Sequence, residues 1–132
     1  MSQYSDLSHL LSTGALLGKL KPVDPMRIQE SQQVHEKLPS DYVDFLTSIG
    51  AGTIGDSQYS LYSGLIDPDF IYGDDRQQVE NILFFGDDFQ GFNAGFKTDE
   101  AWCIVEVNPL DLEVSIVAPD FQTFIREIIA QL

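Results

Sequence analysis

Hydrophobic and polar residues alternate along residues 82–118, the most apolar part of the chain. Within this stretch, Cys103, Val105 and Val107 fall on one side of an extended segment and Ile104 on the other. The alternation is interrupted by short polar turns, which divides the stretch into four strands. Because short links join only neighbouring antiparallel strands, the pattern predicts a four-strand meander.

A helical spacing of apolar residues appears on both sides of this stretch. It predicts helices at about 25–37, 40–49 and 120–131. The last is the clearest, because its apolar residues form one continuous stripe: Phe121, Phe124, Ile125, Ile128, Ile129 and Leu132. Residues 53–63 predict at least one earlier strand. We therefore expect a single α+β domain with a mixed, mostly antiparallel sheet packed by helices.

The N-terminal residues differ from the rest in pattern. Residues 1–24 carry several leucines interrupted by Gly14, which predicts a helical arm preceding a domain at 25–132. The arm has two available docking places, the core of its own domain or a second copy. We favour the core, and so expect a monomer or a weak homodimer.

Composition indicates whether the chain can bury a core and in which compartment it resides. At 132 residues, with 43% hydrophobic residues, the chain is long enough to bury a core. Its one cysteine excludes an internal disulfide, which indicates a reducing compartment. The first residues lack a basic region followed by an apolar run, and no apolar run has the length of a membrane span. A cytoplasmic protein is expected.

Charge is the first indication of function. Twenty-one acidic and seven basic residues give a net charge of −14. Such a surface repels nucleic acid and anionic membranes, and it attracts a basic protein partner. The alternative is that the acidity only maintains solubility.

Candidate catalytic groups do not form a recognisable arrangement. The pairs Asp74-Asp75 and Asp87-Asp88 are adjacent in sequence, so their side chains diverge. Cys103 is in mid-strand without a neighbouring basic residue, and His35 reads as a lone surface side chain. The sequence therefore predicts no enzyme, no cofactor and no metal, although an adventitious calcium ion near Asp87 remains an alternative.

A protein-binding surface is the remaining prediction. Phe89 stands in a loop between Asp88 and Gln90, where a large apolar ring either folds back over the sheet or anchors a partner. Neighbouring aspartates would surround it as an acidic collar if both acidic loops lie at the same end of the sheet. The candidate partner-binding residues are Asp67, Asp69, Asp74, Asp75, Asp87, Asp88, Phe89 and Gln90.

Several motifs in one order resemble the SUKH superfamily, which contains fungal Smi/Knr cell-wall-assembly regulators and many bacterial proteins. The resemblance covers roughly residues 25–132. It is carried by Leu38-Pro39, Tyr42, Phe45-Leu46, Gly50-Ala51-Gly52, Ile82-Leu83-Phe84-Phe85-Gly86-Asp87-Asp88, Gly91, Gly95-Phe96 and Phe121-x-x-Phe124-Ile125.

The resemblance implies an α+β fold without catalysis. It further implies an immunity protein that neutralises a cognate bacterial toxin, many of these toxins being nucleases, and an acidic surface suits a basic toxin domain. The alternatives are a regulatory scaffold that binds an endogenous protein, and a domain that binds a small molecule or metal. The family supplies no catalytic residue to transfer, and the toxin is not identified by the sequence.

Overall fold

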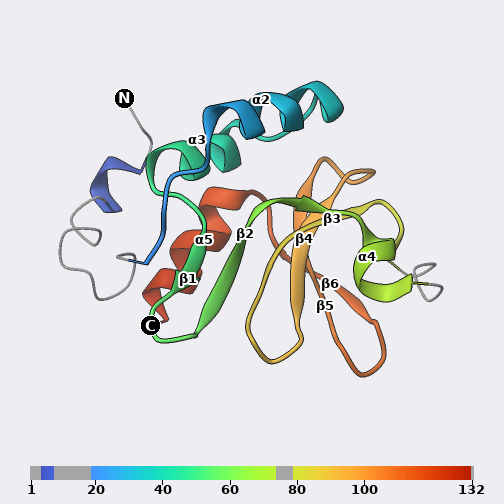
Figure 1. Cartoon of the computed structure of the whole chain (residues 1–132). Helices are drawn as coiled ribbons and strands as arrows, with labels where there is room; N and C mark the ends of the chain where they lie inside the picture. The colour runs from blue at the N-terminus through green and yellow to red at the C-terminus, as the bar shows by residue number, and fades with distance from the viewer. Residues whose placement is uncertain (1–3, 8–18, 74–78, 132) are drawn as a thin grey trace.

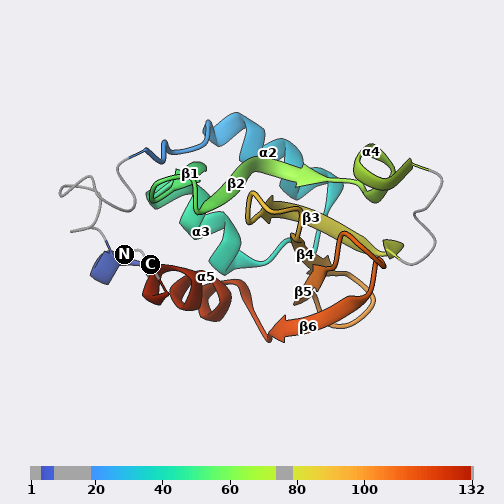
Figure 2. The same ribbon diagram turned by 90° about the horizontal axis from the view of Figure 1, so that it is seen from below.

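A six-stranded antiparallel sheet forms the centre of the structure, a computed structural model that describes residues 4–7, 19–73 and 79–131 (Figure 1). The strands follow one another across the sheet in chain order. They are β1 (Gly52–Ile54), β2 (Tyr59–Ile66), β3 (Ile82–Asp87), β4 (Asn93–Lys97), β5 (Cys103–Val107) and β6 (Val114–Ala118). Figure 2 shows β6 at one margin of the sheet and β2, with α2 (Pro25–Val34), toward the other.

The predicted meander over 82–118 is confirmed, because β3 to β6 pair in sequence order. The earlier strand is also confirmed, and it is two strands, β1 and β2, rather than one. Every strand pair is antiparallel among the described residues, so the sheet is not mixed. Short loops connect most of these neighbours, and such links leave no room for a parallel crossover.

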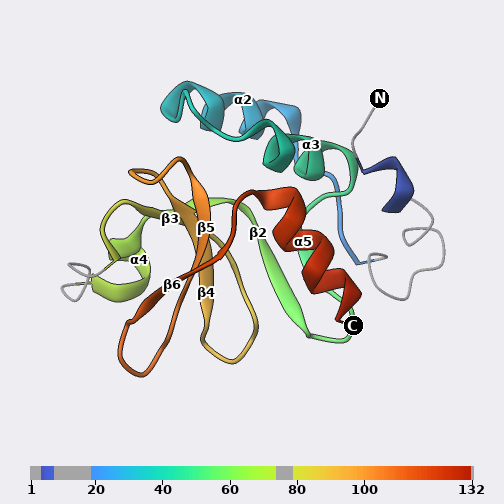
Figure 3. The same ribbon diagram turned by 180° about the vertical axis from the view of Figure 1, so that it is seen from behind.

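The alternating pattern places apolar side chains on both faces of the sheet. On one face, Phe85, Ala94, Phe96 and Ile104 belong to the main core, which α5 (Phe121–Ala130) and α3 (Ser40–Ser48) cover (Figure 3). The opposite face carries a smaller cluster: Val79, Ile82, Phe84, Val105 and Val107. Both faces thus carry buried apolar side chains, and Ile71 and Tyr72 of α4 (Pro68–Tyr72) pack against the smaller cluster.

The three predicted helices are present, with small shifts at their ends. α2 ends at Val34 rather than near residue 37, because His35 has an extended backbone. The helix α4 (Pro68–Tyr72) was not predicted, since its five residues are too few to show a helical period. An aspartate before a proline also begins α2, where Asp24 accepts a hydrogen bond from the Met26 amide, so the same signal was present.

Aromatic rings join the helices to the sheet. Phe85 lies 5.0 Å from Phe96 and 5.2 Å from Phe121, measured between ring centroids. Tyr42 of α3 contacts Phe96 and Phe121 at 5.2 and 5.1 Å. Three of these four contacts are edge-to-face, and aromatic contacts of that kind add about 0.5–1.5 kcal/mol each beyond simple burial. This cluster fixes the helices α3 and α5 relative to the hairpin that carries Phe89.

The described part of the N-terminal arm docks on the core of its own domain. Residues Ser5–Leu7 form a short 3-10 helix, and Tyr4 and Leu7 are buried. The Tyr4 hydroxyl donates to the Asp41 carbonyl at 2.9 Å, and Arg126 of α5 pairs with Asp6. The greater part of the predicted arm, residues 8–18, lies outside the described residues.

Candidate protein-binding surface

Two of the predicted acidic residues, Asp67 and Asp87, lie at opposite ends of the sheet. Asp87 ends β3, whereas Asp67 follows β2 and lines the same cleft as Asn81 and Ile82, where β3 begins. The two strands are antiparallel, and the six residues of β3 extend about 16 Å. Asp67 is therefore not part of an acidic collar around Phe89.

The remaining predicted acids of the α4 side are only partly described. Asp69 lies within α4. Asp74 and Asp75 lie outside the described residues. The hairpin between β3 and β4 is thus the part of the predicted site whose geometry is defined.

Two carboxylates build the loop that carries Phe89. Asp87 Oδ1 accepts a hydrogen bond from the Phe89 amide at 2.9 Å. Asp88 Oδ1 accepts from the amides of Gln90 and Phe92 at 2.8 and 3.1 Å. These bonds support a left-handed backbone at Phe89, with φ of 65°, which is unusual for an aromatic residue. The loop is held open toward solvent, with the Phe89 side chain 50% exposed.

A second loop lies beside the first. The turn between β5 and β6 contacts the Phe89 loop, because a Cβ built on Gly91 would lie 3.1 Å from Pro109 Cβ. Figures 1 and 3 show the two loops next to one another at the same end of the sheet. Leu110, at the tip of the second loop, is 93% exposed.

We call these two loops the hairpin surface, defined by Asp87, Asp88, Phe89, Gln90, Leu110 and Asp111. It combines two exposed apolar side chains with a rim of carboxylates. The side chain of Asp111, like that of Asp87, accepts a backbone hydrogen bond within its own loop, from the Glu113 amide at 2.9 Å. An apolar centre within a polar rim is the arrangement of protein interfaces. Sequence reasoning found Phe89 and missed Leu110, which stood in an ordinary turn sequence.

A chain of side-chain hydrogen bonds supports the hairpin from the second face of the sheet. Tyr72 of α4 donates to Asn93 Oδ1 at 3.1 Å, and Asn93 Nδ2 donates to the Tyr62 hydroxyl at 3.1 Å. Tyr62 in turn donates to Asp87 Oδ2 at 2.6 Å. Burial and the bond to Asp87 raise the pKa of Tyr62, so the phenol keeps its proton. These three hydrogen bonds connect α4, β2 and β4 to Asp87 at the base of the hairpin.

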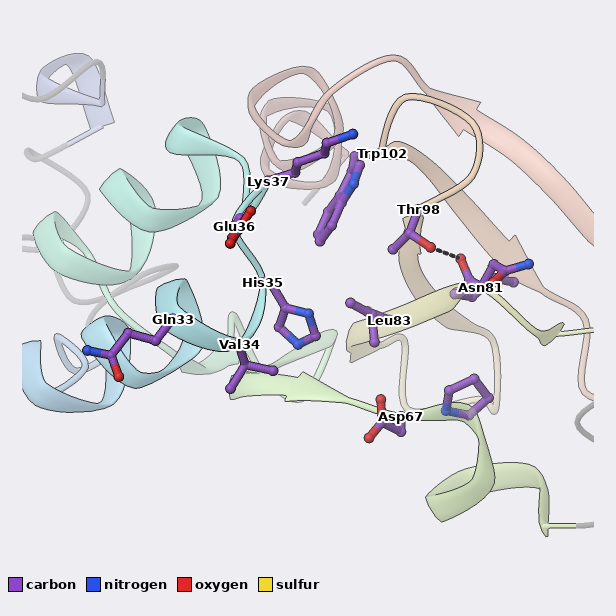
Figure 4. A pocket seen from close by; sticks show the side chains of 12 residues that line it. Gln33, Val34, His35, Glu36, Lys37, Asp67, Asn81, Leu83, Thr98 and Trp102 are labelled. Atoms are coloured by element: carbon purple, nitrogen blue, oxygen red, sulfur yellow. Dashed lines mark hydrogen bonds between the residues drawn. The ribbon is translucent and has the colours of Figure 1, made fainter.

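A separate cleft of about 620 Å³ lies at the opposite end, near the C-terminus of α2 (Figure 4). His35 and Trp102 face one another across it, with ring centroids 6.2 Å apart. His35, predicted as a lone surface side chain, is half-buried and lines this cleft. Trp102 enters the cleft from a tight turn in which Ala101 and Trp102 both have positive φ.

The lining of this cleft combines apolar side chains with ionisable ones, among them His35 and Glu36. Its lining includes apolar Leu83 and charged Lys37 and Asp67, and its one hydroxyl, that of Thr98, donates to the Asn81 carbonyl at 3.1 Å. No group of three histidine, cysteine or acidic residues suited to a metal ion occurs in the described ranges. Burial raises the pKa of the Cys103 thiol, which makes it a poorer nucleophile.

Comparison with known families gives one result that covers most of the chain. The profile of the SMI1 / KNR4 family (SUKH-1) matches residues 22–127. The chain belongs to this family. No curated protein and no solved structure matches it.

Membership in the SMI1/KNR4 family confirms the resemblance to the SUKH superfamily. The family is consistent with a protein-binding domain of the immunity type or the regulatory type, and it is generally non-enzymatic. Among the described residues, no helix has the length and hydrophobicity needed to cross a bilayer.

Proposed function

We propose that this SMI1/KNR4-family protein is an immunity protein that neutralises a cognate bacterial toxin by binding it through the hairpin surface. The observation that carries the proposal is the position of Phe89 and Leu110, two exposed apolar side chains on adjacent loops that also carry carboxylates. A few well-packed side chains supply most of the binding energy of an interface, and the charges at its rim contribute to the choice of partner.

The partner that fits is a basic protein domain. The chain has a net charge of −14, which speeds encounter with a positive surface. A nuclease toxin is one such partner, because its active face carries basic residues that hold the nucleic acid backbone. Bound acidic side chains would occupy those residues and block the substrate.

Co-expression tests the proposal in cells. The toxin domain encoded beside the gene is expressed with the wild-type protein, and growth is measured. We expect the wild type to restore growth. If no adjacent toxin is neutralised, the immunity proposal is overturned, and an endogenous partner recovered by direct binding would favour the regulatory function.

Matched variants test the surface itself. We expect the double variant Phe89→Ser with Leu110→Ser to lose rescue while its thermal unfolding is unchanged, since both side chains are exposed. Met26→Ser is the control, because Met26 is 69% exposed on α2, away from the hairpins. Full rescue by the double variant would place the interface elsewhere.

A further inference from the structure

The two edges of the sheet differ in how they are protected. At one edge, β1 has three residues, and Lys21 exchanges backbone hydrogen bonds with Ala51 directly before it. At the other edge, β6 has β5 as its one strand neighbour among the residues that the structure describes (Figure 2). The five residues of β6 include no charged side chain and no proline, which are the usual means of protecting an edge strand.

The register of β5 and β6 determines which backbone groups of β6 face outward. The Asn108 amide donates to the Glu113 carbonyl at 3.0 Å, so this carbonyl is directed toward β5. Because the direction alternates along a strand, Ser115 also bonds to β5, whereas the amides and carbonyls of Val114 and Ile116 face the open edge. A register shift follows Ile116, so the regular outward groups belong to the half of β6 next to the hairpin surface.

An exposed apolar side chain lies at the same edge. Ile116 is 65% exposed, and its partner on β5 is Val105, which is buried in the smaller cluster. Val114 lies on the same face of β6 as Ile116 and packs against that cluster. The apolar row on this face of the sheet therefore ends in solvent at Ile116, where a further strand would cover it.

Charge distinguishes between the two kinds of strand that can pair with β6. A second copy would bring together two chains that each have a net charge of −14, and such like charges oppose association. The exposed acids Asp111 and Glu113 precede β6 in its own hairpin. Glu106 is the partner of Ser115, so both side chains point to the same face, and Ser115 is small and exposed. A long basic side chain placed beside Ser115 can therefore extend over it toward Glu106.

We propose that β6 binds an extended segment of the partner protein as a seventh strand of the sheet. This segment would place apolar residues beside Val114 and Ile116 and a basic residue beside Ser115. Backbone hydrogen bonds supply the affinity of such strand addition, and the alternating side chains supply its specificity. The inference rests on the proposed function, because that function requires a basic protein partner, and it names the kind of segment that such a partner contributes.

The hairpin surface and the edge of β6 are continuous. Leu110 lies in the loop that leads directly into β6, and Leu110 and Ile116 are both exposed. One partner can therefore contact the hairpin surface with its folded domain and pair with β6 through an adjoining extended segment.

The test uses an acetylated and amidated heptapeptide in which lysine and valine alternate, titrated into the full chain and followed by NMR. At saturation, we expect hydrogen exchange of the Val114 and Ile116 amides to slow by roughly tenfold or more. A peptide with proline in place of each valine has the same charge but cannot pair as a strand, so it should bind roughly tenfold more weakly. Equal binding of the two peptides, or unchanged exchange at Val114 and Ile116, overturns the proposal.

A lysine variant locates the site. Ile116→Lys changes an exposed residue, so its thermal unfolding should be unchanged, and a lysine on the edge opposes pairing with a basic strand. We expect it to bind the lysine-valine peptide roughly tenfold more weakly than the wild type. Met26→Lys is the control, because it adds the same charge to an exposed residue of α2, toward the other margin of the sheet (Figure 2). An equal loss in both variants indicates unspecific repulsion and overturns the proposal.

A second copy as the occupant has its own signature. Analytical ultracentrifugation of the protein without peptide should show a monomer. A dimer, together with slowed exchange of the Val114 and Ile116 amides at high protein concentration, overturns the choice of a basic partner.

The two proposals fail in different ways. The peptide titration requires no toxin, so slowed exchange at the edge without toxin rescue contradicts the immunity function and leaves the strand-binding edge intact. Rescue that persists in Ile116→Lys, together with unchanged exchange in the presence of the peptide, contradicts the strand-binding edge and leaves the immunity function intact.

Discussion

The Tyr62 hydroxyl donates a hydrogen bond of 2.6 Å to Asp87 Oδ2, although the two residues are 25 positions apart in the chain. The other oxygen of the same carboxylate accepts the Phe89 amide. One side chain thus connects the interior of β2 to the backbone of an exposed loop. The hairpin surface owes its shape to this connection.

Replacement of Tyr62 by phenylalanine tests this connection. We expect Tyr62→Phe to lower the free energy of unfolding by about 1–2 kcal/mol, since hydrogen bonds to a charged group are stronger than neutral ones and this pair is partly buried. Urea denaturation followed by circular dichroism measures the change. Unchanged stability would show that water replaces the phenol without cost.

For Tyr42, the same replacement by phenylalanine is expected to change the free energy of unfolding in the opposite direction. Its hydroxyl is buried without a hydrogen-bond partner among the described residues. Because Tyr42→Phe removes that unsatisfied group and keeps the ring contacts, we expect the free energy of unfolding to rise by about 1 kcal/mol. The comparison with Tyr62→Phe in the same urea experiment separates lost hydrogen bonds from lost hydroxyl volume. A loss of stability here would reveal a bound water or another unseen partner.

Gly50 is required where α3 meets the N-terminal segment. A Cβ at this position would lie 2.1 Å from the Lys21 carbonyl oxygen, and φ is 120°. Lys21 and Ala51 exchange backbone hydrogen bonds of 3.0 Å here, so the two backbones cannot separate freely. We expect Gly50→Ala to destabilise the protein by about 2–4 kcal/mol.

Gly64 is the matched control for this substitution. A Cβ on Gly64 would meet no atom within 4 Å, and its φ is not in the positive region. Gly64→Ala should therefore change stability by no more than about 0.5–1 kcal/mol, in the stabilising direction. Thermal unfolding of both variants checks the pair, and equal effects would contradict the close approach at Gly50.

The raised pKa of Glu106 predicts that the stability of the protein depends on pH. Burial and Asp88 raise its pKa in the folded protein above the ordinary value of 4.5, so the folded state binds more protons than the unfolded state between the two values. The contribution of Glu106 to stability therefore falls as pH rises through this window. It is fully unfavourable above the folded pKa and vanishes below the unfolded one.

Glu106→Gln should consequently be more stable than the wild type at pH 7, and the difference should shrink as the pH is lowered through the window. Urea midpoints at several pH values measure this, with the exposed Glu113→Gln as control for the loss of one charge. If the stability difference between Glu106→Gln and the wild type instead grows toward low pH, the pKa of Glu106 is not raised by folding.

Local patterns were sufficient for most of the elements. The spacing of Phe121, Phe124 and Ile125 predicted α5, and alternation at Cys103 to Val107 predicted β5 with the correct faces. Both signals are periodic, so each depends only on neighbours in sequence. The helix α4 was missed because five residues are too few for a period to appear.

The candidate site was predicted only in part, for a different reason. Phe89 was found because an apolar ring in a polar loop is visible in sequence. Leu110 was missed because it stands in an ordinary turn, and only the tertiary structure places that turn beside the Phe89 loop. The loops that carry Asp67 and Asp87 were predicted to form one surface because both are rich in aspartate. The antiparallel register of β2 and β3 places Asp67 and Asp87 at opposite ends.

By itself, the sequence determined the α+β class, the order of the meander and the acidic character of the chain, because periodicity, turn residues and charge are properties of neighbouring or summed residues. Tertiary structure alone decided which acids share a surface, that the Tyr59 ring lies over Gly86, and that Asp87 is held by Tyr62. These relations join residues far apart in the chain, and they exist only once strand register and helix packing fix their positions.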